Sequence, residues 1–273
     1  MKPDIDKSRI EALVNLLQDD NLKVASLAME QILNLGSYAQ QIVDEYTNSS
    51  NARLRRRIHQ LNEVLNRRNS RQRFLEALNN EKIGLWEGIL EINKVHNPDF
   101  TASAISDEIS TIVNNMALQK KDPSIAEIAD FMREQGFTVP EEDILDTELY
   151  LPDCVVSFKY GAAVLLCALT YEVGSHVNWQ PSIALHEGRF CLTDEGNLVL
   201  DPADNWSVKR SSKGDALNRC GKREVWLGIL SQLFLVSMME GDLHEVYNWG
   251  NILAALEGKS IERFPYPLGE ATD

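Results

Sequence analysis

Residues 160–171, YGAAVLLCALTY, contain no charged side chain, and this stretch constrains the fold more than any other. A helix that is apolar all round must be buried on nearly every side, so the rest of the chain has to surround it. We expect this helix over about 158–173, ending at Gly174, because glycine commonly follows a last helical turn. Cys167, near its middle, is then a small core residue.

After Gly174 the spacing of apolar residues becomes typical of strands. Short runs occupy residues 177–185, 188–194 and 197–202, and Asp194-Glu195-Gly196 has the composition of a hairpin loop between the last two. A buried helix followed by antiparallel strands is an α+β arrangement. We expect strand to be confined to about 176–203 and helix to exceed strand several-fold.

The rest of the chain is predicted to be helical, so the fold class is α+β and predominantly helical. Apolar residues recur at helical spacing from residue 8 to about 78. The stretch DDNLKV at 19–24 loosely resembles SSNARL at 49–54, and paired helices recurring in this way suggest HEAT-like repeats. Further helices are expected over 82–95, about 101–118 and 124–135, and two more between 223 and 258, broken at Glu240-Gly241-Asp242.

Four regions follow from this pattern. They are a HEAT-like helical region at 1–80, a second helical part at 81–148, a small α+β core with a short antiparallel sheet at 149–212, and a C-terminal helix pair with a tail at 213–273.

Composition excludes several classes of function. The net charge of −14 disfavours binding to nucleic acid or anionic lipid, because a phosphate-binding surface needs a basic field. The four cysteines form no Cys-x-x-Cys pair, and no two histidines have metal-ligand spacing, so we expect no metal and no cofactor. The N-terminus MKPDIDKSRI lacks an apolar signal segment, and the longest apolar run, 225–239, is too short and too interrupted to span a bilayer. These features predict a cytoplasmic protein without membrane contact.

One cluster of basic residues stands out in this acidic chain. Eight arginines occupy one predicted helical stretch: Arg53, Arg55, Arg56, Arg57, Arg67, Arg68, Arg71 and Arg73. A nucleic-acid groove is one interpretation, but no glycine-rich or aromatic stacking element accompanies the cluster. A solvated helix face paired with acidic neighbours is the interpretation that we favour.

Several short motifs, in this order and spacing, resemble the SirB-like family of bacterial proteins, a branch of the transglutaminase-like superfamily. The resemblance covers about residues 82–258. The motifs are LWEGILEINKVHNPDF at 85–100, the buried helix at 158–173, GRF at 188–190, LDP at 200–202, and WLGILSQLFLVSMMEGDLHEVYNWGNILAAL at 226–256, which is similar to a TPR-like helix pair.

The resemblance implies a degenerate catalytic centre. The superfamily uses a Cys-His-Asp triad, with the thiolate at the start of the buried helix and the other two residues on neighbouring strands. Here Lys159 falls at the cysteine position, Arg189 at the histidine position and Asp201 at the aspartate position. Lysine and arginine form no nucleophile–base pair, since both are cationic at neutral pH. We expect them to surround Asp201 in a salt-bridge cluster whose loss costs about 3–5 kcal/mol if the site is dry.

A displaced triad is the alternative. Cys154, His186 and Asp201 occur in the order nucleophile, base, orienting carboxylate, and Cys154 follows Pro152-Asp153 near a helix start, where a thiol pKa can fall. Cys154 lies five residues before the expected position, however, and His186 lies three residues before its own, which is an odd offset along a strand.

The leading hypothesis is therefore a non-catalytic protein-interaction or regulatory protein on a pseudo-transglutaminase core, with an unknown protein partner. A cryptic cysteine-dependent amidase or hydrolase, and a nucleic-acid binder, are the alternatives.

Overall fold

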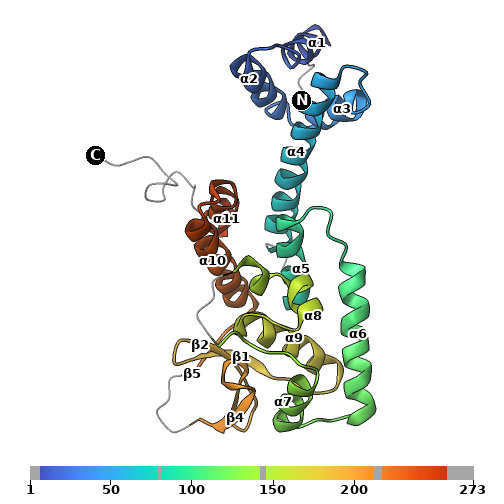
Figure 1. The fold of residues 1–273 in the computed structure, drawn as a ribbon. Helices are drawn as coiled ribbons and strands as arrows, with labels where there is room; N and C mark the ends of the chain where they lie inside the picture. The colour runs from blue at the N-terminus through green and yellow to red at the C-terminus, as the bar shows by residue number, and fades with distance from the viewer. Residues whose placement is uncertain (1–6, 79–81, 142–145, 212–216, 257–273) are drawn as a thin grey trace, which may run out of the picture. The chain divides into compact units, whose positions relative to one another are not determined.

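A computed structural model describes residues 7–78, 82–141, 146–211 and 217–256 (Figure 1). The chain divides into two compact units, Met1–Gln72 and Arg73–Asp273. The division falls inside helix α4 (Ala52–Leu78), whereas the sequence places the first boundary at residue 80. Each unit has a hydrophobic core of its own.

The first unit consists of helices packed on one another: α1 (Lys7–Leu16), α2 (Leu22–Leu33), α3 (Ser37–Tyr46) and the part of α4 up to residue 72. Leu17, Ile32 and Ile58 are fully buried in its core. The side chain of Asn21 caps the N-terminus of α2 by accepting a hydrogen bond from Lys23 N. The predicted amphipathic helices of this region are confirmed, and their assignment as HEAT-like repeats stays a prediction.

The second unit surrounds one buried helix, α9 (Ala163–His176). Leu165, Leu166 and Cys167 are fully buried, as the uncharged sequence predicts. The unit also contains the end of α4 from residue 73, α5 (Leu85–His96), α6 (Ala102–Gln119), α7 (Ile125–Glu134), α8 (Pro152–Phe158), α10 (Lys222–Glu240), α11 (Leu243–Leu256), and the short 3-10 helices η1 (Thr147–Tyr150) and η2 (Pro202–Asp204). None of the helices within the described residues has the length and apolar character that crossing a bilayer requires.

The expected bounds of the buried helix, 158–173 with an end at Gly174, are wrong: α9 begins at Ala163 and continues through Gly174 to His176, and residue 158 ends a separate helix, α8. Helix α8 ends at Phe158, because Lys159 adopts a left-handed conformation with φ 59°. The next residues pair with a distant loop: Thr138 N donates to Lys159 O at 2.9 Å, and Gly161 N donates to Thr138 O at 3.1 Å. This tertiary bridge, at Tyr160, keeps the residues after Lys159 out of a helix, so α9 begins only at Ala163.

A five-stranded antiparallel sheet lies against α9 in the order β4-β3-β2-β1-β5. Its strands are β1 (Ser182–His186), β2 (Arg189–Thr193), β3 (Leu198–Asp201), β4 (Ser207–Arg210) and β5 (Leu217–Arg219). The mostly helical α+β class is therefore confirmed. The expectation that strand stops near residue 203 is wrong, since β4 and β5 lie beyond it. Both are short, largely polar edge strands whose sequences carry little alternation of their own.

The two faces of this sheet differ. Ile183, Leu192 and Leu200 are register neighbours on one face and belong to the main core with α9. Phe190, on the same face, packs against Gly228 of α10. Side chains alternate between the faces of a strand, so His186, Arg189 and Asp201 project from the opposite face.

One helix crossing in the second unit is unusually close. The Trp226 indole of α10 lies so near Gly88 of α5 that a methyl group at position 88 would overlap it. The indole Nε1 also donates to Leu85 O at 2.9 Å, which fixes the orientation of the ring. Glycine at 88 and tryptophan at 226 therefore set the approach of these two helices.

Candidate functional site

Three residues predicted from the sequence, His186, Arg189 and Asp201, meet on the sheet face opposite α9. His186 and Arg189 are cross-strand partners that flank the turn between β1 and β2, and Asp201 ends β3. Arg189 Nη1 lies 3.7 Å from Asp201 Oδ2. The structure thus forms the Arg189–Asp201 ion pair that the motif positions predict.

Strand β4 adds two more polar side chains to this face. Ser207 is the register partner of Asp201, and Lys209 is the register partner of Val199. With His186 and Arg189 they border a hollow of about 240 Å³. The hollow is open to water, because the Arg189 side chain is 53% exposed, although that of Asp201 is only 16% exposed. The site is therefore wet, and the ion pair is screened.

Asp201 has a second, structural role at the end of β3. Its Oδ1 accepts a hydrogen bond from Ala203 N at 2.9 Å and so caps the short 3-10 helix η2 (Pro202–Asp204). Both interpretations from the sequence, a turn-forming Asp-Pro and a partner for Arg189, hold for the same carboxylate.

A small apolar cluster lies beneath the polar side chains of this face. Ala184, Cys191 and Val199 are buried there. Burial, and next the negative charge of Asp201, raise the pKa of the Cys191 thiol to about 11. This thiol is fully protonated at neutral pH.

Lys159 lies apart from the ion pair. It caps the C-terminus of α8 rather than starting the buried helix, and its Nζ lies 6.0 Å from the centroid of the Phe137 ring. Lys159 is exposed and is not among the described residues that line the hollow. The expected cluster of two cations around Asp201 is therefore a single Arg189–Asp201 pair.

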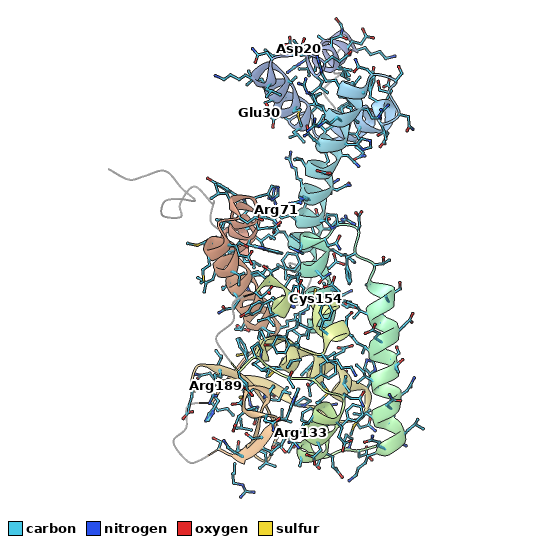
Figure 2. The ribbon with its side chains drawn as sticks, in the orientation of Figure 1. Asp20, Glu30, Arg71, Arg133, Cys154 and Arg189 are labelled. Atoms are coloured by element: carbon cyan, nitrogen blue, oxygen red, sulfur yellow. The ribbon has the colours of Figure 1, made fainter. Side chains whose placement is uncertain are left out.

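Cys154 also lies away from the sheet. It is half-buried in α8, and Figure 2 separates it clearly from Arg189. Burial, followed by the charges of Asp153 and Glu148, raises the pKa of its thiol to about 12. The structure therefore brings His186 and Asp201 onto one face and does not bring Cys154 to them.

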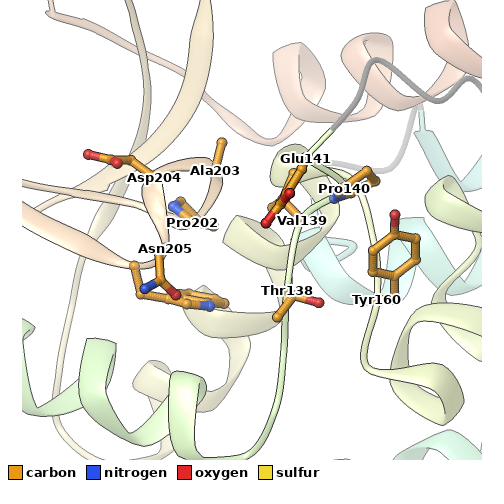
Figure 3. Close-up of a pocket in the computed structure, with 10 residues that line it drawn as sticks. Thr138, Val139, Pro140, Glu141, Tyr160, Pro202, Ala203, Asp204 and Asn205 are labelled. Carbon is orange, nitrogen blue, oxygen red and sulfur yellow. The ribbon is translucent and has the colours of Figure 1, made fainter.

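A larger cavity, of about 750 Å³, adjoins the end of β3 and was not predicted from the sequence (Figure 3). The loop 138–141 and Tyr160 border one side, and residues 202–206 border the other. In Figure 3 the Glu141 and Tyr160 side chains stand on the first side, while the Asp204 carboxylate points away from them. Asp204 instead binds Lys209 and Ser207. No local motif could reveal this cavity, because its two sides come from segments far apart in the chain.

The backbone beside this cavity is strained. Asn205 and Trp206 both have positive φ, 46° and 59°, which is unusual for a bulky residue such as tryptophan. The strain is held by tertiary contacts: Trp206 Nε1 donates to Phe137 O at 2.7 Å, and Arg133 donates to the carbonyl oxygens of both residues at 3.3 Å. Trp206 is 1% exposed, so its indole is part of the packed core.

Several arginines of the α4 cluster bind backbone carbonyl oxygens within the first unit. Arg57 is 8% exposed and donates to the carbonyl oxygens of Leu17 and, at 2.8 Å, Asp19. Arg53 donates to Gln18 O at 3.1 Å, and Arg68 donates to Leu33 O at 3.2 Å. These oxygens lie at or just beyond the C-termini of α1 and α2, where backbone carbonyls lack helical partners and favour a cation.

Among the residues that the structure describes, no three His, Cys, Asp or Glu side chains converge in a way that could hold a metal ion. No family model matches the chain, and no curated protein or solved structure matches it either. The resemblance to the SirB-like family therefore depends on the sequence motifs alone.

Proposed function

We propose that this chain is a non-catalytic protein-interaction or regulatory protein built on a pseudo-transglutaminase core. The observation that carries the proposal is the Arg189–Asp201 ion pair. In the motif resemblance, Arg189 holds the position of the triad histidine and Asp201 that of its aspartate. A guanidinium remains protonated at any physiological pH, so Arg189 cannot take a proton from a nucleophile.

The state of the cysteines supports the same proposal. All four thiols, Cys154, Cys167, Cys191 and Cys220, have a pKa above the ordinary value, and burial is the main cause in each case. A cysteine nucleophile reacts as the thiolate, which requires the opposite shift. The alternative is a hydrolase that uses Cys154, His186 and Asp201. It would require Cys154 to lie next to the sheet and away from its acidic neighbours.

Alkylation kinetics test this proposal on the folded full-length protein. Iodoacetamide labelling of Cys154, followed by mass spectrometry from pH 6 to 10, should be slow and show no inflection in this range, because burial raises the pKa of this thiol to about 12. A free thiol would show an inflection near about 8.5. The chain unfolded in urea is the reference for a freely accessible thiol, and Cys154→Ala identifies the labelled peptide. Rapid labelling with a pKa below about 7, suppressed in His186→Ala, would establish the hydrolase instead.

A further inference from the structure

The turn end of the α10–α11 hairpin exposes a group of large apolar side chains. On α10, Leu235, Met238 and Met239 are 41%, 46% and 66% exposed. Their spacing of three and four residues places them on one strip of the helix. On α11, Leu243 and Tyr247 are 63% and 46% exposed and are one helical turn apart.

This group is not needed for the core of the hairpin. The same two helices bury other residues, among them Leu233 and Val236 of α10 and Val246 and Trp249 of α11. Met239 and Leu243 flank the turn at Gly241, so the two strips lie at the same end of the hairpin. Single exposed apolar residues are ordinary on a protein surface, but a group of five is typical of an interaction site.

The lysine- and arginine-free stretch that carries these residues is acidic. From residue 224 to residue 256 the sequence contains no lysine and no arginine. Glu240 and Asp242 are exposed at the turn. The surface therefore combines apolar side chains, two of them flexible methionines, with an acidic border.

We propose that this hairpin end docks an amphipathic helix of a partner protein, in which lysine or arginine residues flank an apolar stripe. The apolar stripe would cover the exposed side chains, and its basic flanks would face Glu240 and Asp242. Methionine side chains adapt to such helices because they are unbranched and polarisable. The inference rests on the proposed function, since it names the class of partner that the interaction protein takes.

Fluorescence anisotropy with a defined probe tests this site. The probe is a fluorescein-labelled 18-residue peptide of leucine and lysine at helical spacing, added to the full chain at about physiological salt. We expect saturable binding, weakened at least about tenfold in the double variant Met239→Ser, Leu243→Ser, because apolar anchors supply most of such binding energy. Glu240→Lys should weaken binding several-fold, more at low salt than at high salt.

Matched controls separate this site from general attraction to an acidic protein. Leu118→Ser removes an apolar residue that is 85% exposed on α6, and it should leave the affinity unchanged. A peptide with glutamate in place of each lysine should bind at least about tenfold more weakly. Equal binding of the two peptides, or equal loss in Leu118→Ser, would overturn the proposal.

Two other occupants would give different results. A full chain that sediments as a dimer, and becomes monomeric in the double variant, would assign this surface to a second copy. Displacement of the probe by a synthetic peptide of residues 257–273 would assign it to the chain's own C-terminal segment. Either result overturns the partner-helix proposal and leaves the proposed function standing, since that function is tested by thiol reactivity at a separate site.

Discussion

Arg57 in the first unit and Arg189 on the sheet of the second unit are the same side chain in two different environments. Arg57 is 8% exposed and donates to two backbone carbonyls, whereas the Arg189 side chain is 53% exposed and faces one carboxylate at 3.7 Å. A buried guanidinium held by carbonyls connects helix ends and cannot be removed without leaving buried acceptors unpaired. An exposed ion pair contributes little stability and is free to serve recognition. The arginine with a structural role, Arg57, therefore belongs to the cluster that stands out in the sequence, whereas Arg189 lies outside that cluster.

The largest effect that follows from this comparison is on the first unit. Arg57→Ala should lower its free energy of unfolding by about 2–4 kcal/mol, because buried hydrogen bonds to a charged group are lost and their acceptors stay buried. Urea unfolding followed by circular dichroism measures this loss. All five tryptophans, Trp86, Trp179, Trp206, Trp226 and Trp249, belong to the second unit, so tryptophan fluorescence reports on that unit alone.

Arg56→Ala is the matched control, since Arg56 is exposed on the same helix. It should change the unfolding free energy by no more than about 0.5 kcal/mol. If Arg56→Ala and Arg57→Ala were equally destabilising, the distinction between a structural and a solvated arginine would fail.

A smaller loss is expected at the sheet. Asp201→Ala should destabilise the second unit by about 1–2 kcal/mol, because it removes the cap on Ala203 N and a screened ion pair. This is less than the 3–5 kcal/mol that a dry cluster would give, since water reaches Arg189. Asp201→Asn retains an oxygen for the cap but loses the charge. In urea unfolding followed by tryptophan fluorescence, its difference from the parent therefore isolates the ion pair, and its difference from Asp201→Ala isolates the cap.

The ion pair itself should account for less than about 1 kcal/mol, so Arg189→Gln should be nearly as stable as the parent. A loss of 3 kcal/mol in Arg189→Gln would mean that the pair is buried in solution and that the comparison with Arg57 is wrong.

The smallest effect is expected for nucleic acid. With Arg53, Arg57 and Arg68 bound to carbonyls, the full chain should not retain duplex DNA or RNA in a mobility-shift assay at physiological salt. Exchanging Arg55 and Arg56 for alanine should then change nothing. Micromolar binding with a steep salt dependence, lost in that variant, would show that α4 carries a nucleic-acid surface after all.

Much of this architecture could be predicted from local sequence. The absence of charge at 160–171 identified the buried helix, and the motifs GRF and LDP placed Arg189 and Asp201 on neighbouring strands. The break at Lys159 could not be predicted, because it comes from hydrogen bonds to Thr138, a residue in a distant loop. The cavity beside Trp206 was missed for the same reason, since contacts from Phe137 and Arg133 create the local conformation.

The close crossing of α5 and α10 has a consequence for how this chain can diverge. Since a methyl group at position 88 would overlap the Trp226 indole, neither residue can change freely while the other is kept. A homologue with alanine at 88 should carry a smaller side chain at 226, and one that retains the tryptophan should retain the glycine. We therefore expect the two positions to covary, and their joint identity in an alignment would mark which relatives share this helix crossing.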